Sequence, residues 1–369
     1  MPTHRPALRA CERPDSPVPR ALRAAWRALL AGAKRIALGF AGLGAAAACA
    51  ADDGLMKDVT FDDYSAAARS AELARRLFTP LTYLRIAPHL GEARAQPLDL
   101  ANERFVVYVP EGAPPPRGYG LLVFIPPWPE ASLPKDWPPV LDRHGVIFVS
   151  AANSGNDAGL LDRRIPLALL GYENIRRRYP LDADRLYVGG LSGGSRVALR
   201  VALAYPDLFR GALLNAGSDP IGDNGVPLPP AELFRRFQAS TRIVYLTGER
   251  DEINVHNDLV SEKSLRAWCA FDLHALTMPR RAHETANAAA LERALKELEK
   301  PRSTDAEKLA TCRADVDRKL AADVAEASSA LARGERKRAV AKVNAIDQRY
   351  GGLAAKAVAD LESRIGAQD

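Results

Sequence analysis

The sequence has 369 residues, of which 47% are hydrophobic, a composition typical of a folded globular protein and one that excludes wholesale disorder. Its formal net charge is +6, but residues 1–50 hold eight Lys or Arg against two acidic residues. Because 43 basic and 43 acidic residues remain beyond residue 50, that part is neutral, and the basic balance gives no reason to expect a nucleic-acid partner.

Residues 1–50 have the pattern of a secretory signal. A basic segment is followed by the short apolar run RIALGFAGLGAAAACA, which ends in small residues. This order predicts cleavage after Ala50 and export, to the periplasm or out of the cell. The run is shorter than the roughly 20 apolar residues that span a membrane. An uncleaved anchor, an organellar transit peptide and lipidation at Cys49 are the alternatives, and contact with a membrane is expected only if Cys49 is lipidated.

Residues 51–100 are predicted to be a helical segment, with an amphipathic pattern over 58–90. Over residues 101–300, short apolar runs then alternate with helical patterns. The predicted strands are ERFVVYVP, YGLLVFIP, VIFVSAAN, RLYVGG, GALLNAG, RIVYLTG and FDLHALTM. This alternation predicts an α/β fold with a mostly parallel sheet and helices on both faces. In such sheets, ligands bind beyond the carboxyl ends of the strands, so functional residues should follow strands.

Residues 301–369 are predicted to form a helical tail. Thr304 and Glu307 fit a capping box, an apolar stripe follows over 309–331, and Gly351-Gly352 separates two further helices. The tail either packs on the main domain and on itself or serves as a docking or oligomerisation module. The sequence does not indicate an oligomeric state.

Two cysteines lie beyond the leader, Cys269 and Cys312. In an exported protein they either form one disulfide or remain two buried free thiols. Cys312 lies on the apolar stripe of the tail, so the stripe is a candidate to face the body near Cys269. The histidines are scattered without the spacing of metal ligands, and the sequence therefore predicts no metal site.

The stretch GGLSGGSRVA places Ser192 in the pattern G-x-S-x-G, between a predicted strand and a predicted helix. This is the pattern of a nucleophile elbow, a sharp turn that exposes a serine hydroxyl above the sheet. Small residues are needed two positions before and after the serine because strand and helix approach closely there. The alternatives are an ordinary Gly-rich turn, with Ser192 as a helix cap, or a phosphate-binding loop.

A serine hydroxyl needs a general base and a group that orients this base. Asp251 follows the strand RIVYLTG and His283 follows the last strand, so both occupy strand ends in the expected order of acid, then base. The alternative acids and bases are less well placed. These are Glu249, Glu252, Asp219, His256 and His274.

The segment RRYPLDADRLYVGGLSGGSRVALRVALAYPDLFRGALLNAG, the later LTGERD and the stretch RRAHETANAAALERAL resemble the esterases related to polyhydroxybutyrate depolymerases, within the α/β-hydrolase superfamily. The resemblance covers about residues 100–300. It implies the α/β-hydrolase fold, no cofactor, and hydrolysis of an ester through an acyl-enzyme. It also implies that Ser192 is the nucleophile, Asp251 the orienting acid and His283 the base.

One segment departs from that family. Where the family has His-Gly after the strand YGLLVFIP, this chain has Pro126-Pro127-Trp128, and proline has no N–H to donate to an oxyanion. Gly193 N–H is one expected donor, and either Trp128 N–H or the Asn153 side chain is the second.

The expected function is that of an exported serine hydrolase acting on a small or polymeric ester, with a peptidase of the same fold as the subordinate version. A catalytically silent binding protein of this fold is the alternative. Trp128 and Trp137 are predicted either to rim the pocket or to pack their own loop.

Overall fold

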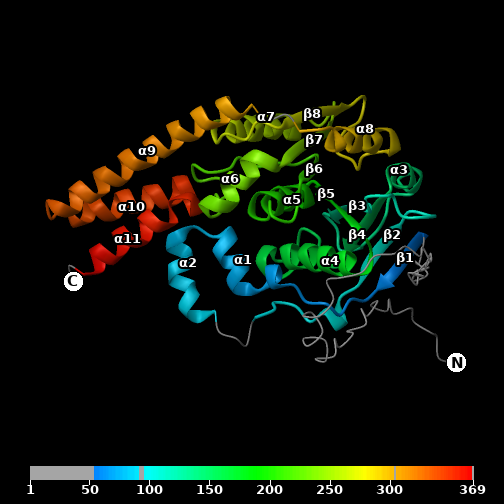
Figure 1. Ribbon diagram of the computed structural model, residues 1–369, viewed down its shortest axis with the longest axis horizontal. Helices are drawn as coiled ribbons and strands as arrows, with labels where there is room; N and C mark the ends of the chain where they lie inside the picture. The colour runs from blue at the N-terminus through cyan, green and yellow to red at the C-terminus, as the bar shows by residue number, and fades with distance from the viewer. Residues whose placement is uncertain (1–53, 91–94, 303–304, 368–369) are drawn as a thin grey trace, which may run out of the picture. The chain divides into compact units, whose positions relative to one another are not determined.

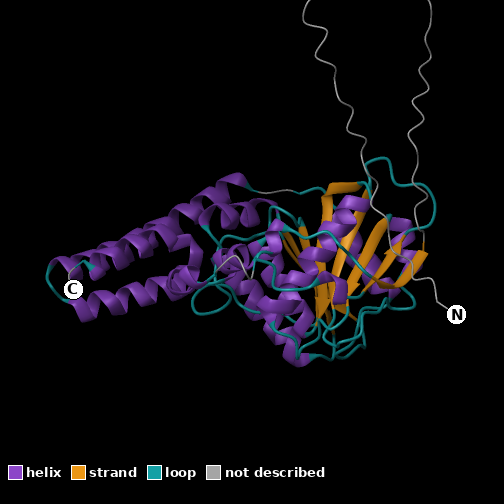
Figure 2. Cartoon of the chain, turned by 90° about the horizontal axis from the view of Figure 1, so that it is seen from below, coloured by secondary structure: helices purple, strands orange, loops and turns teal. Residues whose placement is uncertain are grey.

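Residues 54–90, 95–302 and 305–367 are described by the computed structural model, and the predicted leader, including Cys49 and Ala50, lies outside them. The described residues form one sheet of eight strands in the order β1-β2-β4-β3-β5-β6-β7-β8 (Figures 1 and 2). β2 is antiparallel to β1 and β4, and the remaining pairs are parallel. The strands are β1 (Gly54–Val59), β2 (Phe105–Val109), β3 (Tyr119–Ile125), β4 (Val146–Ala151), β5 (Leu181–Leu191), β6 (Gly211–Asn215), β7 (Arg242–Gly248) and β8 (Leu273–Met278).

Helices cover both faces of this sheet. Every residue of β3, β4, β6 and β7 is buried, because these strands are covered from both sides. Along β3, alternate side chains enter two separate cores, one shared with α4 and α5 and the other with α3 and α8. The helices that accompany the sheet are α1 (Ser70–Leu77), α2 (Pro80–Ile86), α3 (Pro138–His144), α4 (Ile165–Arg178), α5 (Gly193–Ala204), α6 (Ala231–Ser240), α7 (Glu252–Ala267) and α8 (Ala288–Glu299).

The strand order and the helices on both faces define the α/β-hydrolase fold, and this prediction is confirmed. The seven predicted strands are present. The eighth, β1, lies inside residues 51–100, where only helix was predicted, so the sheet begins at Gly54 rather than near residue 101. β1 is an edge strand with mostly exposed or half-buried side chains, and it therefore lacks the continuous apolar run by which the other strands are recognised. The helical part of 58–90 is two short helices, because Pro80 starts a new one.

The tail consists of α9 (Ala306–Ala332), α10 (Arg336–Tyr350) and α11 (Ala355–Gly366). It packs on itself and on the body of the protein (Figure 1). Gly352 N–H donates to Leu228 O at 2.6 Å, and Tyr350 packs edge-on against Trp268. The buried carboxylate of Asp347 accepts a 2.8 Å hydrogen bond from Leu81 N–H at the start of α2. The N-cap of α9 is Asp305, whose side chain accepts from Lys308 N–H, and the predicted cap, Thr304, lies outside the described residues.

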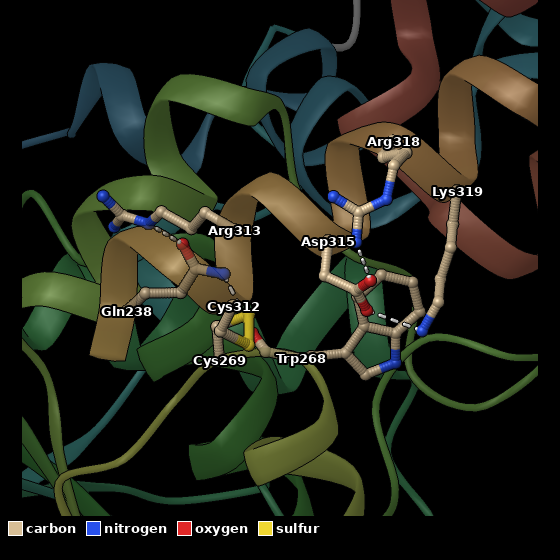
Figure 3. Close-up of a disulfide and its surroundings, with 8 residues drawn as sticks. All are labelled: Gln238, Trp268, Cys269, Cys312, Arg313, Asp315, Arg318 and Lys319. Carbon is tan, nitrogen blue, oxygen red and sulfur yellow. Dashed lines mark hydrogen bonds and ion pairs between the residues drawn. A yellow bond between two sulfur atoms is a disulfide. The ribbon is translucent and has the colours of Figure 1, made fainter. Parts of the chain in front are cut away.

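A disulfide joins Cys269, just past the end of α7, to Cys312 in α9 (Figure 3). Beside it, Gln238 of α6 donates to Trp268 O at 2.8 Å and accepts from Arg313 Nε at 2.6 Å. The tail is thus attached to α6 and α7 by one covalent bond and by polar contacts. Among the described helices, none is long and apolar enough to cross a membrane.

His144 of α3 contacts two carboxylates of α8. His144 Nδ1 lies 2.7 Å from Glu299 Oε2, and Nε2 lies 3.2 Å from Glu292 Oε1. The hydrogen bond with Glu299 raises the pKa of His144 above its usual value, because it favours the imidazolium.

The free energy of unfolding is therefore expected to depend on pH through His144. Because the pKa of His144 is higher in the folded than in the unfolded protein, the protonated imidazole stabilises the folded state. This stabilisation is complete below about pH 6.5, the pKa in the unfolded chain, and it is lost as the pH rises through the folded-state pKa. Urea unfolding across this range should show wild-type stability falling relative to a His144→Gln variant. Parallel pH profiles for the two proteins would contradict the assignment.

Candidate active site

Ser192 lies at the turn between β5 and α5, in the conformation of a nucleophile elbow. Its φ of 55° and ψ of −120° are strained for a residue with a side chain. A Cβ on Gly190 would overlap the backbone of Gly194, and a Cβ on Gly194 would overlap Ile125 O. Both glycines are thus required by the close approach of strand and helix. The turn presents the half-buried Ser192 beyond the carboxyl end of β5.

Asp251 and His283 form a direct pair. His283 Nδ1 lies 2.7 Å from Asp251 Oδ2. Asp251 is 8% exposed, and Asn254 Nδ2 donates to both of its oxygens at 2.9 Å, so the carboxylate has a fixed orientation. When Nδ1–H donates to this carboxylate, Nε2 is the ring nitrogen that is free to accept a proton. The His283 side chain is 46% exposed and thus accessible to a substrate.

Backbone contacts hold the loops of this pair together. Arg250 N–H donates to Arg281 O at 2.8 Å, and Glu249 N–H donates to Met278 O at 3.0 Å. A Cβ on Gly248 would lie 2.6 Å from Arg281 O, so only glycine fits where these loops meet. The acid loop after β7 and the histidine loop after β8 therefore act as one unit.

The alternative acids and bases are engaged elsewhere. Asp219 pairs with Arg196 and Arg200, and Glu249 accepts a hydrogen bond from Arg280 N–H. Of the histidines, His274 is held between Asp272 and Glu297 on β8, whereas His256 is exposed on α7. Glu252 is an exposed residue in the first turn of α7. Among the candidates, only Asp251 and His283 contact each other.

Asn215, at the end of β6, links the three loops. Its carbonyl accepts from Ser192 N–H at 2.8 Å. Its side-chain Nδ2 donates to Leu246 O at 3.0 Å and to Glu284 O at 3.3 Å, and its Oδ1 accepts from Ala286 N–H at 2.8 Å. Asn215 is 1% exposed. The elbow, the acid strand and the histidine loop are thereby held to a single residue. No hydrogen bond joins Ser192 to His283 in the described chain, and such bonds often form only with substrate.

Sequence reasoning did not single out Asn215, although its position at a strand end in GALLNAG was the available signal. Asn215→Ala is expected to lower the free energy of unfolding by about 1–3 kcal/mol, because Ala286 N–H loses its partner and Leu246 O keeps only Ala216 N–H as a donor. Thermal or urea unfolding measures this loss. Asn344→Ala, at an exposed position of α10, is the control, and equal stabilities for the two variants would contradict the prediction.

A second buried carboxylate lies on α7, one turn beyond Asn254. Asp258 accepts from Ser218 Oγ at 2.6 Å and from Thr247 Oγ1 at 2.5 Å. Burial raises the pKa of Asp258. It ties α7 to the strand end before Asp251, and no local motif marked it in the sequence.

The predicted oxyanion donors are carried by two backbone segments. Gly193 is the first residue of α5, and the Pro126–Trp128 segment follows β3, which pairs with β5. Trp128 is half-buried, and its N–H has no hydrogen-bond partner among the described residues. Asn153 N–H donates to Pro129 O at 2.6 Å, so this residue anchors a neighbouring loop.

Trp137 does not rim a pocket. It is fully buried, packs edge-on against Phe124 and Phe148, and donates from Nε1 to Ala286 O at 2.7 Å. The alternative, that it packs, therefore holds for Trp137, and it supports the loop that carries His283. In the described residues, no group of three or more His, Cys, Asp or Glu side chains is placed to hold a metal ion.

No protein-family model matches the chain, and no curated protein matches its sequence. Solved structures of several hydrolases are similar to it, including the following three. The poly(3-hydroxybutyrate) depolymerase LpqC from Bordetella parapertussis is 17% identical, with a TM-score of 0.41 over 57% of this chain and 88% of that one. The S-formylglutathione hydrolase FrmB from Staphylococcus aureus is 12% identical, with a TM-score of 0.38 over 53% and 92%.

The third is the dipeptidyl peptidase 4 of Porphyromonas gingivalis, which is 14% identical with a TM-score of 0.38. The match covers 53% of this chain and only 33% of the peptidase. The fold assignment itself rests on the strand order and the elbow at Ser192 in this chain.

Proposed function

We propose that the protein is an exported serine hydrolase that cleaves a carboxylic ester through an acyl-enzyme on Ser192. The observation that carries this proposal is the 2.7 Å pair of His283 and Asp251 on loops tied to the strained elbow of Ser192. Nucleophilic catalysis requires a serine held up by such a turn and an imidazole oriented by an acid, and both are present here at strand ends of one sheet.

In the proposed mechanism, Ser192 Oγ attacks the ester carbonyl while His283 Nε2 takes the hydroxyl proton. Asp251 stabilises the imidazolium, and Gly193 N–H and Trp128 N–H face the oxyanion. The tetrahedral intermediate collapses, and His283 returns the proton to the departing alcohol. Water then attacks the acyl-enzyme by the same route, which releases the acid and restores Ser192. These steps need no cofactor.

The surface next to Asp251 supports a substrate with an apolar part. On α7, the exposed side chains include Ile253 (75% exposed) and Leu259 (63%), together with Val255 and Val260. Apolar groups on one helix next to a candidate active site suit the hydrocarbon portion of a small or polymeric ester. A peptide has fewer such portions, and for this reason we favour an ester.

Export is supported by two features. The first is the basic, then apolar, then small-residue order of residues 1–50. The second is the disulfide between Cys269 and Cys312, since disulfides persist mainly in oxidising compartments. Localisation of the full chain in a fractionated cell tests this proposal.

The function is tested by labelling the purified protein with a fluorophosphonate and measuring intact mass. We expect one adduct on the wild type, none on Ser192→Ala, and strongly slowed labelling of His283→Ala. Absence of any adduct on the wild type would reject the hydrolase and favour the catalytically silent binding protein.

A further inference from the structure

The segment after β3 offers little to an oxyanion. Pro126 and Pro127 have no N–H, which leaves Trp128 N–H as the first amide of this segment. A missing oxyanion donor lowers kcat by about 10²–10³-fold. A second group from elsewhere in the chain would therefore have a large effect on rate.

The loop after β4 crosses this segment and is fixed to it. Asn156 N–H donates to Pro127 O at 2.9 Å, and Asn153 N–H donates to Pro129 O. A Cβ on Gly155 would lie 2.7 Å from the carbonyl carbon of Trp128, so glycine is required at this crossing. The loop thus brings its side chains to the elbow.

Arg164 hydrogen-bonds to both segments. It is 6% exposed, and it donates from Nε to Ser154 O at 2.9 Å and from Nη2 to Pro126 O at 3.1 Å. No carboxylate in the described chain lies within ion-pair distance of it. Its guanidinium is satisfied by the backbone carbonyls of these two loops, which gives them a fixed relative position.

The carboxamide of Asn156 lies directly against Gly193. If Gly193 carried a Cβ, this atom would overlap Asn156 Oδ1 and lie 2.8 Å from Cγ and 3.2 Å from Nδ2, so the carboxamide oxygen is the atom nearest to Gly193. This contact explains a glycine at position 193, which the elbow pattern does not itself demand. Asn156 is exposed, and its side chain makes no hydrogen bond with any described residue. Because no described residue holds the carboxamide, rotation about the Cβ–Cγ bond exchanges Oδ1 and Nδ2 and brings the N–H donors to a ligand that also reaches Gly193.

We propose that the side chain of Asn156 is a donor of the oxyanion hole, acting with Gly193 N–H. This inference rests on the proposed function and extends it to a residue that replaces part of the backbone donor set lost to the prolines. The amide is neutral and donates through Nδ2–H to the oxygen of the carbonyl under attack. The proton stays on Asn156 throughout, and the bond strengthens as negative charge develops on that oxygen.

The test compares Asn156→Ala and Asn156→Asp in the full chain, with p-nitrophenyl butyrate as substrate. Asn156→Ala is expected to lower kcat by about 10²–10³-fold with KM little changed. Asn156→Asp has the same shape but only acceptors facing the oxyanion, so it should be at least as impaired. Asp157→Ala, on the exposed neighbour, is the control and should match the wild type. A structural role would instead predict that the isosteric Asp variant keeps its activity.

A second arm uses Gly193→Ala, whose methyl group displaces the Asn156 amide but keeps the 193 N–H. Its loss of kcat should be similar to that of Asn156→Ala, and the two losses should not add in the double variant. Thermal unfolding of each variant checks that the fold is retained. Additive losses would overturn the inference.

Fluorophosphonate labelling separates this inference from the function on which it rests. If the wild type labels and Asn156→Ala labels at the same rate, the inference fails and the hydrolase stands. If the wild type neither labels nor hydrolyses the ester, both are rejected.

Discussion

Replacing Ser192 by alanine is expected to reduce ester turnover by about 10⁶-fold, the loss typical of removing a nucleophile that works together with its base. The side chain lies in a strained turn, and the paired His283 and Asp251 have no other hydroxyl on this elbow to activate. Steady-state hydrolysis of p-nitrophenyl butyrate measures the effect. Ser240→Ala, at the end of α6, is the matched control and should retain wild-type turnover.

The same experiment tests whether Ser192 and His283 act as a unit. If they do, the variant lacking both should be no slower than Ser192→Ala alone. If the two single losses of activity multiply in the double variant, His283 does not act together with Ser192 in the same step. Turnover that persists in Ser192→Ala would reject Ser192 as the nucleophile.

Loss of the disulfide has the largest expected effect on stability. Cys269 and Cys312 are 43 residues apart, and closing a loop of this length restricts the unfolded chain by about 4 kcal/mol in the loop-entropy account. Cys269→Ala, Cys312→Ala and the double variant should therefore all unfold at the same, lower urea concentration. Unfolding with and without a reducing agent measures this difference.

The wild type provides its own control here. Under reducing conditions the wild type should unfold at the same urea concentration as the double variant. A reductant should not change the unfolding of the double variant. At temperatures where all variants remain folded, labelling of Ser192 should be equal, because Asp251 lies at the opposite end of α7 from the disulfide. A wild type that is equally stable with and without reductant would contradict the prediction.

Much of the fold and of the candidate site follows from local patterns. β5 and β7 end in continuous apolar runs, and β8 is recognised by alternating apolar residues, so all three strand ends could be located, and with them the positions of Ser192, Asp251 and His283. β1 was missed because an edge strand with exposed side chains has no such run.

The supporting residues are not visible in local patterns. Asn215 and Asn156 matter because strand register brings their loops to the elbow, and Arg164 matters because it contacts two loop carbonyls from the position just before α4. No residue spacing in the sequence predicts these contacts. A strand-end asparagine is a weak signal, and an arginine without a carboxylate partner can be recognised only in the folded chain.

The contact between Asp347 and Leu81 has a consequence for the order in which the chain folds. The two residues are 266 positions apart, and a helix as short as α2 is not stable alone in water. α2 is synthesised early, but the hydrogen bond at its first turn can form only after residue 347 has been synthesised. Such long-range closure slows folding. A chain ending before residue 347 would leave the start of α2 without this partner and more open to proteases.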